Sequence, residues 1–184
     1  AAAMVLEDDE FSTIIGAVAQ GRVIYTNIRK FVVYLLSCNL SEILVIGVAT
    51  LVGAAPPLLP LQILFLNLVT DVFPALALGA CGAEKGIMKQ APRPRSEPLI
   101  GHQQWARISS HALLITLSVV GGVELAAHLP GLEQNSPLTL AFLILAFSQL
   151  WHVFNMRADH SRSMSNEITR NPWIWAAVAV CIAI

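Results

Sequence analysis

The chain contains several apolar runs long enough to cross a lipid bilayer, and this feature excludes most soluble folds. A helix rises about 1.5 Å per residue, so roughly 20 apolar residues span the hydrocarbon layer. Hydrophobic residues make up 55% of the chain, charged residues only 12%, and the mean hydropathy is +0.65. We therefore predict an all-α polytopic transmembrane helical bundle of about five spans, the last truncated, with a cytoplasmic stalk helix at the N-terminus. The expected spans are residues 31–52, 58–80, 106–127, 138–156 and 173–184.

The basic residues are distributed unevenly between these spans. All 11 lysines and arginines precede the first span, follow the second or follow the fourth. Segments 53–59 and 128–137 contain none. The positive-inside rule therefore places the basic segments in the cytoplasm and the other two segments outside. We expect an integral multi-pass protein of the plasma membrane or an organelle membrane, with the lipid bilayer as a partner and no nucleic acid.

The two ends of the sequence both look cut. The start has no basic n-region followed by an apolar h-region, as a signal peptide would have. The last apolar run, from Trp173, is too short to span a bilayer. We therefore expect a fragment of a larger protein. The three cysteines, Cys38, Cys81 and Cys181, are far apart and are expected to be packing residues or free thiols.

Two carboxylates lie near the middle of predicted spans rather than at their ends. Glu42 lies roughly 18 Å beyond Lys30 and roughly 16 Å before Gly53, and Asp71 lies about as deep in its own span. A carboxylate at that depth costs on the order of 2.5–3.5 kcal/mol on insertion scales. Amide and hydroxyl side chains accompany both at helical spacings of three or four residues, on the same helix faces. The candidate metal ligands are Asn39, Glu42, Asn67, Thr70, Asp71 and, from the fourth span, Gln149.

The donor atoms of this set are all oxygens. They favour a hard cation such as Ca²⁺, Mg²⁺, Mn²⁺, Na⁺ or K⁺ over copper or zinc. With both carboxylates bidentate the set supplies about eight oxygens, within the range of about 6–8 that Ca²⁺ takes. Two carboxylates balance one divalent ion, and protons are expected to replace it when it leaves, because desolvated charges are costly. The alternative is that these polar groups only form hydrogen bonds between helices.

Three further features leave alternatives open. Pro74 cannot donate to the carbonyl of Thr70, so this oxygen needs another partner, for which we favour an ion over a local rearrangement. The loop Gly79–His102 either docks against a cytoplasmic domain or is a solvated connector. His152 and Asn155 form a polar stripe with Gln149, and the first two are expected to hold helices together rather than bind the ion.

Several motifs together resemble the calcium-pump branch of the P-type ATPases. They are the stretch Met4–Arg29, Asn39-x-x-Glu42, Asn67-Leu68-Val69-Thr70-Asp71, Pro74–Gly79 and Pro92-Arg93-x-x-x-Glu97-Pro98-Leu99. The resemblance is strong over the first hundred residues and weaker beyond them. The family's site residues fall on Asn39, Glu42, Asn67, Thr70 and Asp71, whereas reticulum-type pumps have a glutamate where this chain has Gln149.

The resemblance implies a division of the chain and a function. Residues 1–20 would be the C-terminal tail of the cytoplasmic phosphorylation domain, 21–30 the stalk, and 31–184 the transmembrane domain with the fifth to ninth of ten spans. The full-length enzyme would be a P-type ATPase, a translocase that moves Ca²⁺ and uses ATP and Mg²⁺. This fragment lacks the DKTGT motif and the nucleotide site and should be inactive alone, its partners being the missing N-terminal spans and cytoplasmic domains. The alternatives are a pump for Mn²⁺, Mg²⁺ or Na⁺, or a passive channel or secondary-transporter module.

Overall fold

The computed structural model describes residues 11–84, 86–94, 97–129, 137–157 and 166–184, and these are all helix or loop. Four helical segments are long and apolar enough to cross a membrane: Ser12–Leu51, Pro60–Gly79, His102–Ala127 and Pro137–Met156. A shorter apolar helix, α6 (Pro172–Ala183), follows them. The predicted all-α membrane bundle is confirmed. The predicted division into a domain tail, stalk and membrane domain stays a prediction, and residues 1–10 of that tail lie outside the described part.

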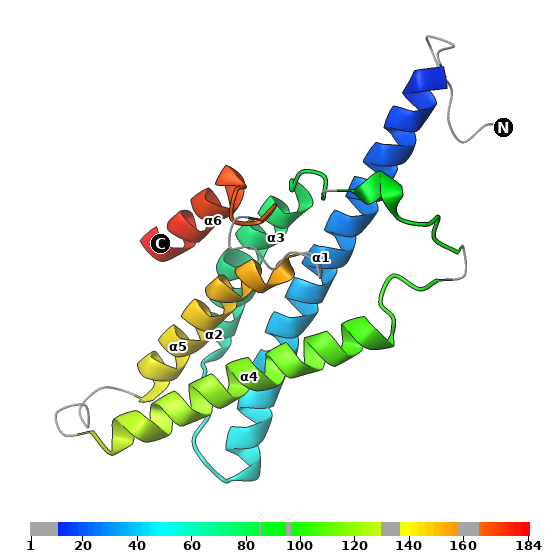
Figure 1. The fold of residues 1–184 in the computed structure, drawn as a ribbon. Coiled ribbons are helices and arrows are strands. Elements are labelled where there is room, and N and C mark those ends of the chain that lie inside the picture. Colours follow the sequence, from blue (N-terminus) through cyan, green and yellow to red (C-terminus); the bar gives the residue numbers. More distant parts are fainter. Residues whose placement is uncertain (1–10, 85, 95–96, 130–136, 158–165) are drawn as a thin grey trace.

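The longest element is α1 (Phe11–Leu51), a single helix of 41 residues that joins the predicted stalk to the first span. No proline interrupts it, because the first prolines of the chain, Pro56 and Pro57, come after its end. Gly53, with φ of 69°, follows the helix in the left-handed conformation that favours glycine. The chain then returns along α1, as Figure 1 shows.

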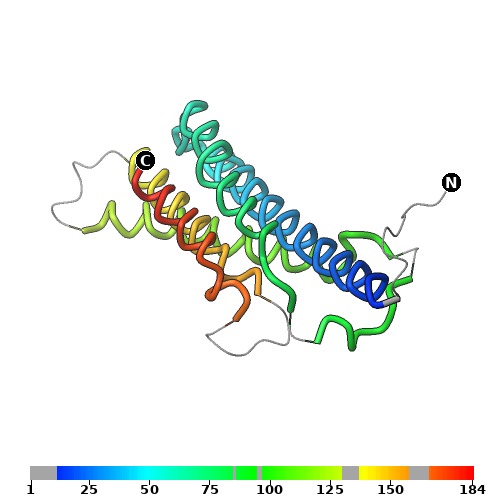
Figure 2. Tube along the Cα trace, turned by 90° about the horizontal axis from the view of Figure 1, so that it is seen from above, coloured from blue at the N-terminus to red at the C-terminus, as the bar shows by residue number. Residues whose placement is uncertain are grey.

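The second span is broken into three helical pieces. They are α2 (Pro60–Phe65), the π-helical turn η1 (Leu66–Thr70) and α3 (Val72–Gly79). The third span is α4 (His102–Ala127), which begins four residues before the predicted span. The fourth is α5 (Pro137–His152), extended by the 3-10 turn η3 (Val153–Met156). Figure 1 shows α4 crossing α1 obliquely, and Figure 2 shows α1 running alongside the second span.

The core consists of two apolar clusters with a polar layer between them. The cluster nearer the stalk includes Tyr34, Cys38, Leu78 and Val153, and the cluster nearer Gly53 includes Val45, Leu66, Ile115 and Leu145. On α1, Ser41 and Glu42 lie between the two clusters, and both are buried. Thr70 and Asp71 on the second span and Gln149 on α5 occupy the same interval and are also buried. The helices therefore stack the deep polar residues into one layer.

The loop after α3 is attached to the stalk half of α1. Arg22 donates to the carbonyl oxygens of Ile87 and Gln90 at 2.9 and 2.7 Å, within and just after the short 3-10 turn η2 (Ile87–Lys89). Asn27 donates to the carbonyl oxygens of Gly79 and Cys81 at 3.1 and 2.7 Å. Two alternatives are expected for this loop from the sequence, docking against a cytoplasmic domain and a solvated connector. In the structure its described residues dock against the stalk half of α1, a contact that neither alternative includes.

Candidate cation site

Glu42 is the centre of the polar layer and is 4% exposed. Its Oε2 accepts a hydrogen bond from Asn67 Nδ2 on the second span at 3.1 Å. Its Oε1 accepts one from Gln149 Nε2 on α5, also at 3.1 Å. Amides from two other membrane helices therefore hold the carboxylate in place. These contacts bring together three of the six predicted ligands, including the one from the fourth span.

Asp71 is the second carboxylate of this layer and is 1% exposed. Neither of its oxygens has a hydrogen-bond partner among the described residues, and the same is true of Gln149 Oε1. Asp71 and Glu42 are thus both buried carboxylates of the same polar layer. Buried acceptors without donors are rare in folded proteins, and a bound cation is one of the few groups that satisfies several at once. The donor set therefore suits a hard cation.

The π-helical turn determines where Thr70 and Asp71 lie. The Asp71 N–H bonds to the carbonyl oxygen of Leu66, five residues back, at 3.0 Å. Such a turn inserts an extra residue into the helix, and π-bulges of this kind are frequent at functional sites. The Thr70 hydroxyl donates to the same Leu66 oxygen at 2.7 Å, which leaves the lone pairs of the hydroxyl oxygen as acceptors.

The carbonyl oxygen of Thr70, which Pro74 deprives of its helical donor, lies beside Tyr34 of α1. The Tyr34 hydroxyl is 3.1 Å from this oxygen and 3.3 Å from the carbonyl oxygen of Gln149. From the sequence alone we expect an ion beside this oxygen, and nothing in that expectation involves Tyr34. A signal was present, because Tyr34, Cys38 and Glu42 are spaced by four residues and so share one face of α1.

Asn39 is the predicted ligand that the structure does not bring into this network. Its Nδ2 donates to the carbonyl oxygen of Leu35 on its own helix at 2.8 Å, and the residue is half-buried. Among the described residues it forms no hydrogen bond with another predicted ligand. Its part in ion binding therefore stays a prediction.

His152, the next residue of the polar stripe on α5, packs against aromatic rings. Its ring stacks on Tyr34 with centroids 5.8 Å apart and lies 4.5 Å from the ring of His111 on α4. Asn155 Nδ2 is 3.3 Å from His152 Nδ1. In the described part of the chain no three His, Cys, Asp or Glu side chains gather into one metal-binding cluster. The candidate metal-binding oxygens of the polar layer come instead from two carboxylates, amides and a hydroxyl.

The fold and this layer define a polytopic helical membrane protein with oxygen donors buried between its spans. A family model described as "Cation transporting ATPase, C-terminus" matches residues 55–184. The chain belongs to this family of cation-transporting ATPases.

Curated relatives support the same assignment. The chain is 37% identical over 188 residues to "Calcium-transporting ATPase 1" of Bacillus cereus, covering 95% of this chain and 21% of the relative. It is 39% identical over 173 residues to "Calcium-transporting ATPase" of Bacillus subtilis, covering 94% and 19%. It is 35% identical over 187 residues to "Calcium-transporting ATPase 1" of Lactococcus lactis, covering 100% and 21%. The chain thus spans about a fifth of the length of these relatives.

Proposed function

We propose that this chain holds the transported Ca²⁺ of an ATP-driven pump, with Glu42 and Asp71 as the charged ligands. The observation that carries the proposal is the contrast between the two carboxylates. Glu42 is fixed by amides from two other helices, whereas neither oxygen of buried Asp71 has a donor among the residues that the structure describes. A divalent cation between them would neutralise both charges and supply the missing partner.

Calcium is favoured over other cations by donor chemistry and by the relatives. Carboxylate, amide and hydroxyl oxygens suit Ca²⁺, which accepts irregular shells of about 6–8 oxygens, whereas Mg²⁺ requires a tight octahedron. The relatives named above are called calcium-transporting ATPases. These names also favour a pump over a passive channel or secondary transporter. Gln149 in place of a third carboxylate fits the binding of one divalent ion in this layer.

The coupling of the site to the cytoplasm would run through α1. This helix carries Glu42 in the polar layer and is continuous with the stalk half, to which the loop after α3 is attached. A shift of the stalk would therefore change the distance between Glu42 and the ligands of the second span. Asp71 lies on the second span, after a π-turn, and would not be forced to move with α1.

The test uses the full-length pump that contains this chain, reconstituted in sealed vesicles. Glu42→Gln and Asp71→Asn should each weaken calcium activation of ATP-driven uptake by at least about a hundredfold, since breaking a buried charged set costs about 3–5 kcal/mol. Glu124→Gln is the matched control, because this glutamate on α4 is 74% exposed and pairs with His128. The control should retain the affinity of the unaltered pump.

The same preparation separates the alternatives. Uptake driven by Mn²⁺, Mg²⁺ or Na⁺ in the absence of Ca²⁺ would change the assigned ion. Calcium flux without ATP would favour a passive channel or secondary transporter. Unchanged calcium affinity in both carboxylate variants would remove the site from these two helices.

A further inference from the structure

His152 is a buried side chain of α5 that contributes no candidate ligand to the cation site. It is 3% exposed and lies three residues after Gln149, on the same face of the helix. Its ring stacks on the ring of Tyr34, with centroids 5.8 Å apart and planes 18° apart. A further neighbour is the ring of His111 on α4, 4.5 Å away between centroids and tilted by 55°. An imidazole of α5 is therefore packed against rings from two other helices.

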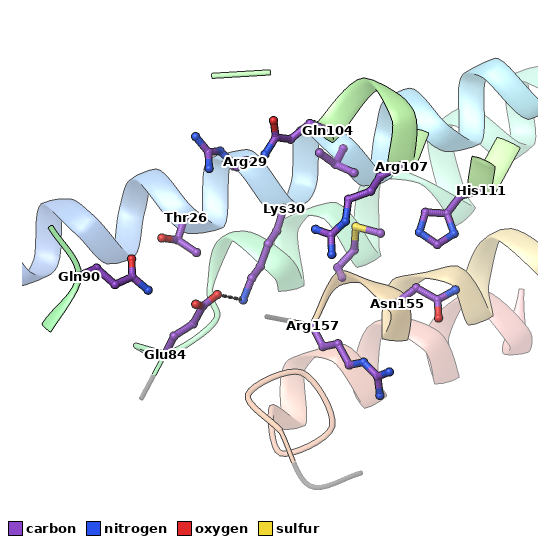
Figure 3. A pocket seen from close by; sticks show the side chains of 12 residues that line it. Thr26, Arg29, Lys30, Glu84, Gln90, Gln104, Arg107, His111, Asn155 and Arg157 are labelled. Carbon is purple, nitrogen blue, oxygen red and sulfur yellow. Dashed lines mark ion pairs between the residues drawn. The ribbon is translucent and has the colours of Figure 1, made fainter. Parts of the chain in front are cut away.

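The ring of His152 is held by this packing and by one polar contact. Its Nδ1 lies 3.3 Å from Nδ2 of Asn155, about one turn further along the chain. Its Nε2 has no hydrogen-bond partner among the residues that the structure describes. Asn155 and His111 also line a cavity of about 310 Å³ near the stalk end of the bundle, as Figure 3 shows. The contacts of His152 therefore lead from the wall of this cavity to Tyr34.

Tyr34 connects His152 to two candidate ligands of the cation. Its hydroxyl is 3.1 Å from the carbonyl oxygen of Thr70 and 3.3 Å from that of Gln149. A tyrosine hydroxyl has a single hydrogen to donate, so it cannot fully satisfy both carbonyls at once. The O–H bond of a phenol lies in the plane of its ring, because a lone pair of the oxygen conjugates with the ring. The plane of the Tyr34 ring therefore determines which carbonyl the hydrogen reaches.

A neighbouring ring is needed to set this plane. The torsion between Cβ and an aromatic ring has a broad energy profile, so the rotamer of Tyr34 alone does not fix it. Stacking on a flat imidazole restricts the rotation. We propose that His152 is a positioning residue for the cation site and acts through the Tyr34 hydroxyl on the backbone of Thr70 and Gln149. Its role rests on the calcium site proposed above, because His152 is assigned no contact with the ion.

The experiment measures calcium activation of ATP-driven uptake by the full-length pump in sealed vesicles. His152→Leu removes the ring and should raise the calcium concentration for half-maximal uptake about two- to tenfold, the factor that corresponds to one aromatic pair. The rate at saturating calcium should change less, since no ligand is altered. His152→Phe keeps a flat ring and should restore most of the affinity. Trp151→Leu is the matched control, because Trp151 is 54% exposed and contacts the ring of Phe154.

A double-variant cycle tests the route through Tyr34. Tyr34→Phe removes the hydroxyl, so His152→Leu should have no further effect on calcium affinity in this background, whereas independent effects would add. Additive effects would overturn the proposal. An unchanged calcium affinity in His152→Leu, with only a lower unfolding temperature, would also overturn it, because a purely structural role gives this result. His152→Gln lacks the ring as well and should behave as His152→Leu, so the test does not depend on the folding of one variant.

Two outcomes separate the role of His152 from the cation site itself. If Glu42→Gln weakens calcium affinity and the ring-lacking variants of His152 do not, the site stands and His152 has no part in it. If neither Glu42→Gln nor Asp71→Asn weakens calcium affinity, the site lies elsewhere and the role of His152 falls with it.

Discussion

The hydroxyl of Tyr34 lies 3.1 Å from the carbonyl oxygen of Thr70, the oxygen that loses its helical donor to Pro74. Tyr34 is fully buried on α1, and Thr70 ends the π-turn of the second span. One hydrogen bond therefore joins the helix that carries Glu42 to the backbone immediately before Asp71. Tyr34 on α1 thus supplies the donor that the Thr70 carbonyl on the second span lacks.

Tyr34→Phe should destabilise the protein by about 1–3 kcal/mol, the usual cost of a buried carbonyl left without a donor. The unfolding temperature of the purified protein measures this loss. Tyr25→Phe is the matched control, because Tyr25 is on the stalk half of α1 and its hydroxyl accepts from Arg29 in a partly buried position. A larger effect in the control than in Tyr34→Phe would contradict the role assigned to this bond.

Gln149→Leu should lower the calcium affinity of the full-length pump by about ten- to a hundredfold, because hydrogen bonds to charged groups contribute about 1.5–3 kcal/mol. The substitution removes the donor to Glu42 Oε1 and an unpartnered acceptor, Gln149 Oε1. The loss should remain smaller than that of Glu42→Gln. Calcium titration of ATPase activity measures it, with the neighbouring Ser148→Ala as control. An affinity equal to that of the unaltered pump would exclude Gln149 from the site.

Lys30→Met should destabilise the protein by about 3–5 kcal/mol, because it removes the shared cation of two ion pairs that are largely buried. Lys30 is 8% exposed and pairs with Glu84 at 2.7 Å and with Glu167 at 3.1 Å, and both carboxylates are largely buried. Lys30→Arg keeps the charge and should cost less. Lys89→Met, at an exposed position of the loop that carries Glu84, should leave the unfolding temperature nearly unchanged. If Lys30→Met were as stable as Lys89→Met, this ion-pair cluster would not contribute to the fold.

Gly122→Leu should destabilise the contact between α4 and α5 by about 1–3 kcal/mol, the usual cost of overpacking. A Cβ atom at Gly122 would lie 2.5 Å from Cδ1 of Ile144. Gly121→Leu is a close control, because a Cβ atom at the adjacent glycine meets nothing within 4 Å. Ile144→Ala should restore part of the stability of Gly122→Leu. Equal unfolding temperatures for the two leucine variants would show that the helices separate without cost.

The parts of the fold that follow from hydrophobicity were predictable from sequence. Apart from the start of α1, which lies in the stalk half, the helix ends lie within a few residues of the predicted spans, because length and apolarity decide whether a segment crosses a membrane. The meeting of Glu42 with Asn67 and Gln149 also follows from depth, since polar groups at one depth of a bundle find one another.

What sequence reasoning missed depends on contacts between distant residues. No residue type in Leu66–Thr70 marks a π-turn, and although Tyr34 shares a helix face with Glu42, this spacing does not show which carbonyl its hydroxyl reaches. The attachment of the loop to α1 relies on backbone carbonyls as acceptors, for example Ile87 and Cys81. Carbonyl positions carry no sequence signal. Asn39 shows the converse, because its residue type fits a ligand while its amide bonds to its own helix.

Because α1 is one unbroken helix, a tilt at one end displaces residues along its whole length. Glu42 lies roughly 18 Å along the helix from Lys30, so a tilt of about five degrees at the membrane boundary displaces the carboxylate by roughly 1.5 Å. Metal–oxygen distances tolerate only a few tenths of an ångström. In the calcium site proposed above, such a tilt would exceed this tolerance and open the coordination shell, without any ligand changing its own conformation.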